Sequence, residues 1–279
     1  MKNSISIFGC GWLGEPLAVH FLGLTESPER DFLGLAESPE RDSVNNKYSV
    51  NGSTTTENKM QKLSALGIKP YLIKLDTVSS DILEFLSSEI LIIAVPSKDI
   101  EGFKTLAKYI EKSTVKFVLF VSSTSVYANS NELITEETPV INSALAEIEN
   151  IFITNNSFKT TVIRFGGLIG YNRKPGLFYP KGRIIDNPDS AVNMIHRDDC
   201  IGIIEAIIEK EIWNEIFNGC ADTHPTKREF YTKAALDIGI ELPVFDEIKI
   251  SENKMVSNKK LSEKLNYKFK YPDLLNITE

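Results

Sequence analysis

Short apolar runs alternate along the chain with longer amphipathic stretches. The apolar runs span residues 4–8, 47–53, 70–75, 89–95, 115–121 and 160–165. Helical patterns lie at residues 15–22, 57–66, 99–111 and 143–153, and again at 226–238. Apolar runs of this length between helices are typical of parallel strands that are buried on both faces. The pattern therefore predicts an α/β fold built on a doubly wound parallel sheet.

A glycine-rich turn joins the first predicted strand to the first predicted helix. It reads Gly9-Cys10-Gly11-Trp12-Leu13-Gly14. Gly9 and Gly11 allow the backbone to bend and to approach a ligand closely, and Gly14 allows the helix to lie against the strand. The amide groups around Trp12 and Leu13 then point toward a diphosphate at the helix N-terminus. This succession predicts a dinucleotide-binding loop, and an ordinary glycine-rich turn is the alternative.

The end of the second predicted strand indicates which dinucleotide is bound. Folds of this class that prefer NAD place an Asp or Glu there, which binds the adenosine ribose hydroxyls. This chain has Ser53, Thr54 and Thr55 instead, with Lys59 one turn later. Hydroxyl groups and a cation suit a 2′-phosphate better than a carboxylate does, so we predict that NADP is preferred over NAD. A helix N-cap within residues 54–56 is compatible with the same residues.

Other strand ends supply further candidate cofactor contacts, because the carboxyl ends of parallel strands meet at one edge of the sheet. The third predicted strand ends at Asp76, and the fourth ends at Ala94, Val95 and Pro96. Ser122 follows the fifth. We therefore include these residues in the predicted cofactor site.

A tandem duplication follows the first predicted helix. Residues 21–31 recur as residues 32–42, and Thr25 against Ala36 is the only difference between the copies. The duplication connects a helix to the next strand, on the edge of the sheet opposite the ligand crevice. We interpret it as a surface insertion, since such loops tolerate extra length at small entropic cost. An oligomer contact is the alternative.

The composition limits which classes of molecule the protein is expected to bind. The 279 residues carry a formal net charge of -7, with a pI near 5.2, which gives no general attraction to nucleic acid. The 3 cysteines are far apart and there are only 3 histidines, which argues against disulfides and a structural zinc and favours a reducing cytoplasm. The apolar run at residues 90–95 is too short to span a membrane as a helix. We expect a cytoplasmic protein without a membrane, nucleic-acid or metal partner.

Several short segments together carry a family resemblance. They read Val121-Ser122-Ser123-Thr124-Ser125-Val126-Tyr127, Glu137-Thr138-Pro139, Val162-Ile163-Arg164-Phe165-Gly166-Gly167 and Met194-Ile195-His196-Arg197-Asp198-Asp199. In these segments the chain resembles the extended short-chain dehydrogenase/reductases, the NAD-dependent epimerase/dehydratase family, over nearly its whole length. The resemblance implies a Rossmann-type NAD(P)-binding domain at residues 1–168, with the insertion at 21–42. It further implies that residues 169–279 are mainly a small C-terminal substrate lobe, with segments near 194–220 returning to the core, and that the protein forms a homodimer.

The resemblance implies that Ser123 is the catalytic Ser/Thr, which hydrogen-bonds the reacting oxygen of the substrate. Sugar dehydratases of the family continue with Asp and Glu, whereas this chain has Thr124 and Ser125, which argues against a sugar dehydratase. No tyrosine here has a lysine four residues later, so the family's Tyr-x-x-x-Lys acid/base pair is absent. In this respect the chain resembles the atypical short-chain dehydrogenases. Tyr127, the phenol nearest to Ser123 in sequence, is a candidate for proton transfer, with packing as its alternative.

One basic, aromatic-rich segment, residues 170–183, falls where the family's substrate lobe begins. Candidate contacts for an anionic or sugar-like substrate are Arg173, Lys174, Lys181 and Arg183. A solvated loop is the alternative interpretation. Farther along, Asp198 and Asp199 follow His196 and are expected to serve in capping or ion pairing rather than in catalysis.

Two hypotheses about function follow from these residues. The first is an NAD(P)-dependent oxidoreductase or epimerase-like enzyme that acts on a hydroxyl or carbonyl group of a small, sugar-derived substrate. The second is a non-catalytic protein of the same fold that senses NADP(H) or a metabolite, which the missing tyrosine and lysine would allow.

Overall fold

The computed structural model describes residues 3–24, 48–76, 81–179, 184–248 and 253–277. Residues 25–42 of the duplication, and the candidate substrate contacts Lys181 and Arg183, lie outside the described residues. The chain divides into two compact units. The first unit comprises Met1–Ser122, Ser143–Val162 and Trp213–Glu215, and the second unit comprises Ser123–Asn142, Ile163–Ile212 and Ile216–Glu279.

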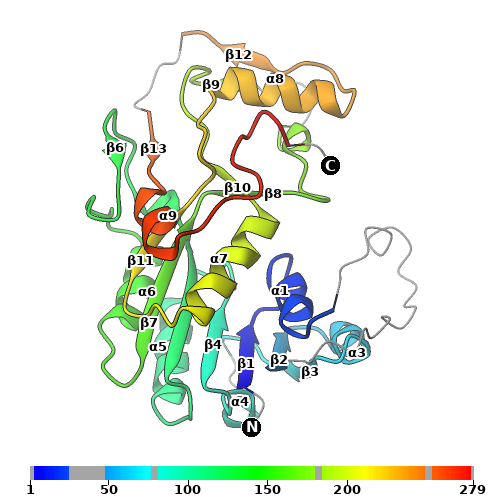
Figure 1. Cartoon of the computed structure of the whole chain (residues 1–279), viewed down its shortest axis with the longest axis vertical. Helices are drawn as coiled ribbons and strands as arrows, with labels where there is room; N and C mark the ends of the chain where they lie inside the picture. The colour runs from blue at the N-terminus through cyan, green and yellow to red at the C-terminus, as the bar shows by residue number, and fades with distance from the viewer. Residues whose placement is uncertain (1–2, 25–47, 77–80, 180–183, 249–252, 278–279) are drawn as a thin grey trace. The chain divides into compact units, whose positions relative to one another are not determined.

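A 7-stranded sheet forms the centre of the fold, in the order β11-β7-β5-β4-β1-β2-β3 (Figure 1). Its strands are β1 Asn3–Phe8, β2 Tyr48–Thr54, β3 Lys69–Leu72, β4 Ile90–Ile93, β5 Phe117–Ser123, β7 Lys159–Phe165 and β11 Ile216–Gly219. Strand β1 pairs in parallel with β2 and with β4, and the outer pairs β2–β3 and β4–β5 are parallel as well. The predicted Rossmann-type parallel sheet is confirmed.

Helices connect these strands close to the predicted positions. They are α1 Gly14–Phe21, α3 Glu57–Ala65, α4 Ile82–Phe85, α5 Ile100–Ile110, α6 Ala144–Ile153, α7 Arg197–Glu209, α8 Lys227–Asp237 and α9 Lys259–Leu265. Short 3-10 helices are η1 Thr124–Val126 and η2 Pro175–Leu177. Within the described part of the chain, no helix is long and apolar enough to cross a membrane.

An aromatic cluster fixes α5 and α6 against the first unit's sheet. Phe103 of α5 and Phe152 of α6 both pack on Phe120 of β5, with ring centroids 6.0 Å and 5.3 Å away. All three side chains are buried. Burying a side chain of this size stabilises the fold by about 1.5–3 kcal/mol. The helix that would carry the family's tyrosine and lysine is therefore held in place by apolar packing.

Small parallel ribbons build the second unit. They pair β8 Gly167–Ile169 with β10 Met194–His196, β9 Ile184–Asp186 with β12 Val244–Asp246, and β6 Leu133–Ile134 with β13 Met255–Val256. Apolar side chains between these ribbons and α8 form this unit's core, among them Ile169, Phe230 and Leu274.

Asp199, in the first turn of α7, fastens the chain's C-terminal segment within the second unit. Its fully buried carboxylate accepts hydrogen bonds from the Tyr267 hydroxyl at 3.0 Å and from the backbone amides of Lys270 and Tyr271 at 2.7 and 3.0 Å. Burial raises the pKa of Asp199, and these hydrogen bonds oppose the rise. These contacts make Asp199 an acceptor for the C-terminal segment, a structural role that differs from the predicted capping or ion pairing.

Replacing Asp199 with Ala should destabilise the protein, because buried amide groups lose their acceptor. We expect a loss on the order of 3 kcal/mol in the free energy of unfolding, measured by urea denaturation. Asp237→Ala is the control, since Asp237 is half-exposed and pairs with Lys233 across one helical turn. Equal effects of the two substitutions would contradict this role for Asp199.

Candidate functional site

A large hollow lies in the first unit at the carboxyl ends of β1 to β4. It encloses about 1410 Å³, counted with its solvent-open mouth. The predicted cofactor residues that line it are Gly9, Cys10, Gly11, Ser53, Thr54, Thr55, Lys59, Asp76, Ala94, Val95 and Pro96. The strand ends thus bring together residues that lie far apart in the sequence. Trp12, Leu13 and Gly14 continue from the lining turn into α1, and Ser122 does not line the hollow.

The three glycines of the turn lack a side chain for different structural reasons. Gly9 adopts a φ of +102°, and a Cβ there would lie 2.3 Å from Val95 Cγ1. A Cβ at Gly14 would lie 2.2 Å from the Gly9 carbonyl oxygen, so α1 begins in direct contact with the turn. A Cβ at Gly11 would meet no atom within 4 Å. Gly9 and Gly14 are therefore required by packing, whereas the missing side chain of Gly11 leaves room for a ligand.

Ser53 holds the turn in this shape. Its hydroxyl oxygen accepts a hydrogen bond from the Gly9 amide at 2.9 Å, and its carbonyl oxygen accepts one from the Cys10 amide at 2.9 Å. Ser53 is only 2% exposed. The Ser53 hydroxyl, which we predicted to contact the cofactor, thus contacts the loop, and Thr55 and Thr56 carry exposed hydroxyls just beyond this strand end.

The N-terminus of α1 follows the turn without a side-chain cap. Leu13 occupies the N-cap position, and its side chain forms no capping hydrogen bond. Amide groups in the first turn of such a helix have no partner within the helix, and they carry the positive end of its dipole. Here the Glu15 amide already donates to the Gly11 carbonyl at 3.1 Å, and Pro16 has no N–H. A diphosphate beside Gly11 would therefore meet the amides nearer the turn, those of Leu13 and Gly14, and the residues present fit a dinucleotide.

Lys59 occupies the wall of the hollow near the end of β2. Its ammonium group lies 3.2 Å from Glu15 Oε2, and Lys62 pairs with the other oxygen of the same carboxylate at 2.5 Å. Lys74 lines the hollow too, and sequence reasoning missed it because it lies just beyond β3 with no motif around it. Lys59 and Lys74 thus bring positive charge to the wall of the hollow.

Cys10 is the thiol closest to the predicted cofactor. It is buried, and burial raises its pKa to about 12. A thiol with so high a pKa is protonated at neutral pH and is a poor nucleophile. Cys10 therefore contributes its backbone and its volume rather than thiol chemistry.

Ser122 donates its hydroxyl to a buried carboxylate. Its Oγ lies 2.5 Å from Glu149 Oε1, and Glu149 is 2% exposed in the middle of α6. This contact gives Ser122 a structural partner in the first unit. Glu149 carries no sequence signal for such a role, since an Ala-Glu-Ile-Glu stretch also suits an exposed helix.

Ser123 and Tyr127 flank η1 in the second unit, and their environments differ. Ser123 is partly exposed, and its Oγ accepts a hydrogen bond from the Ser125 amide at 3.1 Å. Tyr127 is 2% exposed, and its hydroxyl accepts from Arg164 Nη1 at 2.7 Å while donating to Asn218 Oδ1 at 2.9 Å. Burial raises the pKa of Tyr127. These contacts favour the packing interpretation of Tyr127 over proton transfer.

Of the predicted substrate contacts, Arg173 and Lys174 lie within the described residues, and both are exposed. Close to it in the second unit, the Arg197 guanidinium stacks 3.6 Å from the Tyr171 ring centre, and the Tyr171 hydroxyl bonds Asp198 at 3.0 Å. His196 is buried and caps α7, because its Nδ1 accepts from the Asp198 amide. His196 is therefore the N-cap of α7, whereas the sequence predicted a capping or ion-pairing role for Asp198 and Asp199.

Comparison with known proteins identifies the fold but no family model matches. Protein YeeZ of Escherichia coli strain K12 is 26% identical over an alignment of 291 positions, which covers 98% of each chain. The UDP-glucuronic acid 4-epimerase of Bacillus cereus, in complex with UDP-glucuronic acid and NAD, has a TM-score of 0.73 at 14% identity, covering 98% of this chain and 96% of that one. A short-chain dehydrogenase/reductase superfamily protein of Agrobacterium tumefaciens with bound NAD has a TM-score of 0.70 at 14% identity, covering 96% and 93%. The chain therefore has the fold of the NAD-binding epimerases and dehydrogenases, as the resemblance implied.

The glycine turn yields a test that separates folding from binding. Gly11→Ala should leave the melting temperature unchanged, because its Cβ meets no protein atom, but should weaken dinucleotide binding about tenfold. Gly14→Ala should lower the melting temperature, because its Cβ collides with the Gly9 carbonyl. Thermal unfolding and fluorescence titration with NADPH measure the two effects. A Gly11→Ala protein with unchanged affinity would contradict the placement of the ligand.

Proposed function

We propose that the protein is an NAD(P)-dependent oxidoreductase or epimerase-like enzyme that acts on a hydroxyl or carbonyl group of a small, sugar-derived substrate in the cytoplasm. The observation that carries the proposal is the turn at Gly9 to Gly14, which leaves open space beside Gly11 and an uncapped helix N-terminus next to it. The hollow around this turn is large enough for a dinucleotide.

In the proposed reaction a bound nicotinamide supplies the hydride chemistry, and the protein binds and orients the reactants. The first unit would hold the diphosphate through the amides of the turn. Ser123 would orient the substrate: its oxygen already accepts from the Ser125 amide, so its own hydroxyl proton can be donated to a substrate oxygen. Such a donor stabilises negative charge that develops on that oxygen during the reaction.

A specific observation favours the second candidate function, a non-catalytic sensor of NADP(H) or a metabolite. The phenol nearest to Ser123 in sequence is enclosed by Arg164 and Asn218, so Tyr127 has no access to a substrate proton in this arrangement. Helix α6 carries neither tyrosine nor lysine. A sensor needs the dinucleotide site and nothing that moves a proton.

Turnover separates the two functions. The full chain is incubated with NADPH or NADH and a panel of aldehydes, ketones and nucleotide sugars, and the absorbance of the reduced cofactor is followed. An enzyme should oxidise the cofactor with one substrate class, and Ser123→Ala should lower kcat/KM about a hundredfold. Ser125→Ala is the matched control, because it keeps the backbone amide that Ser123 Oγ accepts from. Cofactor binding without turnover on any substrate would refute the enzyme and support the sensor.

The residues at the end of β2 support a preference for NADP over NAD. Exposed Thr55 and, from the neighbouring elements, Lys59 of α3 and Lys74 just beyond β3 would contact a 2′-phosphate. The similar structures named above hold NAD, so the preference is a property proposed for this chain alone.

Side-by-side titration tests the preference. Lys59→Ala should weaken NADPH binding about fivefold and leave NADH binding nearly unchanged, because only NADPH carries the extra phosphate. Lys62→Ala is the matched control, since it pairs with the same Glu15 and does not line the hollow. Tighter binding of NADH than of NADPH would contradict the proposal.

A further inference from the structure

A second hollow lies wholly within the second unit, between α8, η2 and the C-terminal segment. It encloses about 660 Å³, counted with its open mouth. None of its lining residues belongs to the dinucleotide hollow, so whatever it binds is a separate ligand or a separate part of one.

The walls of this second hollow are mainly apolar. Phe230 and Ala234 from α8 face Ile169, Leu274 and Ile277 from the rest of the unit. Ile169, Phe230 and Leu274 are also members of the unit's buried core, so the hollow reaches down to that core. An apolar ligand group would displace water from these walls, at about 25 cal/mol for each Å² of apolar surface buried.

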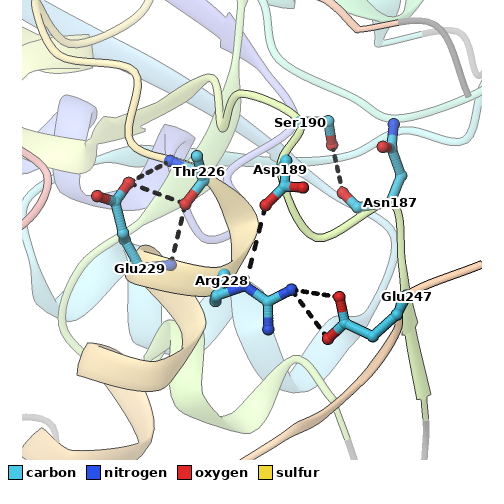
Figure 2. A network of polar contacts seen from close by, with 7 residues as sticks. All are labelled: Asn187, Asp189, Ser190, Thr226, Arg228, Glu229 and Glu247. Atoms are coloured by element: carbon cyan, nitrogen blue, oxygen red, sulfur yellow. Dashed lines mark hydrogen bonds and ion pairs between the residues drawn. The ribbon is translucent and has the colours of Figure 1, made fainter. Parts of the chain in front are cut away.

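The wall that α8 provides is fixed at its N-terminus (Figure 2). Thr226 and Glu229 form a capping box, in which each residue bonds the other's backbone amide. Arg228 donates to both carboxylate oxygens of Glu247 at 2.9 and 2.7 Å, and its Nε lies 3.9 Å from Asp189. On the other wall, a Cβ at Gly176 would lie 2.6 Å from the Ala234 carbonyl, so η2 packs directly on α8. The hollow is therefore largely preformed.

The charged side chains that line the second hollow carry a net positive charge. Lys233 Nζ contacts both carboxylate oxygens of Asp237, at 2.6 and 2.8 Å, so these two charges compensate each other. Lys174 also lines the hollow, and no carboxylate lies within ion-pair distance of it among the described residues. The remaining charge in an otherwise apolar site suits one anionic group on an apolar body.

We propose that the second hollow binds a small carboxylic acid with a compact apolar body, such as a branched alkyl chain or a single ring. The body packs between Phe230, Ala234 and Leu274, and the carboxylate pairs with Lys174. This site works without the dinucleotide and does not depend on the reaction proposed above.

Ligand-observed NMR on the full chain, without any dinucleotide, tests the site. The probes are 3-phenylpropanoate and 4-methylpentanoate, each compared with the corresponding amide. We expect both acids to bind at millimolar concentration and the amides to bind about fivefold more weakly, because they lack the charge. Lys174→Gln should abolish the difference between acid and amide. Lys108→Gln, an exposed lysine of α5 in the first unit, is the matched control and should preserve it.

Filling the second hollow tests its location. Ala234→Phe, or Ile277→Trp if the first variant fails to fold, should weaken acids and amides alike by at least about tenfold. Gly11→Ala should leave acid binding intact, which separates a failure of this site from a failure of the dinucleotide site. The proposal is overturned if no probe binds, if acids and amides bind equally to the unmodified protein, or if a folded filled variant binds the acids normally.

Discussion

The backbone of Ser53 and its hydroxyl provide the contact on which the first unit's hollow depends. They accept the amides of Gly9 and Cys10, so the carboxyl end of β2 determines the path of the turn that leaves β1. With that path fixed, Gly9 must adopt a positive φ beside Val95, and α1 must start against the Gly9 carbonyl. The amide groups that remain available lie at the uncapped start of α1, where an anion is favoured. Two hydrogen bonds from the turn to the end of β2 thus fix the path of the backbone beside which we propose that a diphosphate binds.

Dinucleotide binding and proton transfer require different chemical groups. The chain supplies the groups for binding more fully than the groups for proton transfer. A diphosphate needs backbone amides and absent side chains, which the turn supplies. Proton transfer needs a titratable group that a substrate can reach. Near Ser123 in sequence the titratable group is Tyr127, and its hydroxyl is already shared between Arg164 and Asn218. The glycine turn and the uncapped helix start of such folds are therefore present in this chain, while the acid/base pair of the short-chain dehydrogenases has no counterpart in α6.

The sequence predicted the features that local physics determines. Apolar runs marked the strands, and the spacing of Gly9, Gly11 and Gly14 marked the binding turn, because period and glycine conformation are properties of short segments. It could not predict how side chains distant in sequence would pair. Ser53, predicted to contact the cofactor, lines the hollow and also bonds a loop 44 residues away. Tyr127 meets Asn218 across 91 residues. Which hydroxyl remains available to a ligand depends on such contacts, and no local pattern encodes them.

The two hollows share no lining residue, and this limits how one ligand can influence the other. A ligand shifts a conformational equilibrium only by the difference in its affinities for the two states. The second hollow is bounded by α8, whose start is fixed by the Thr226 capping box and the Arg228 ion pairs, so we expect its shape to change little on binding. Acid and dinucleotide are therefore expected to bind with nearly additive free energies. Strong coupling between them would require that α8 moves as a body, and that this motion changes the loop held by Ser53.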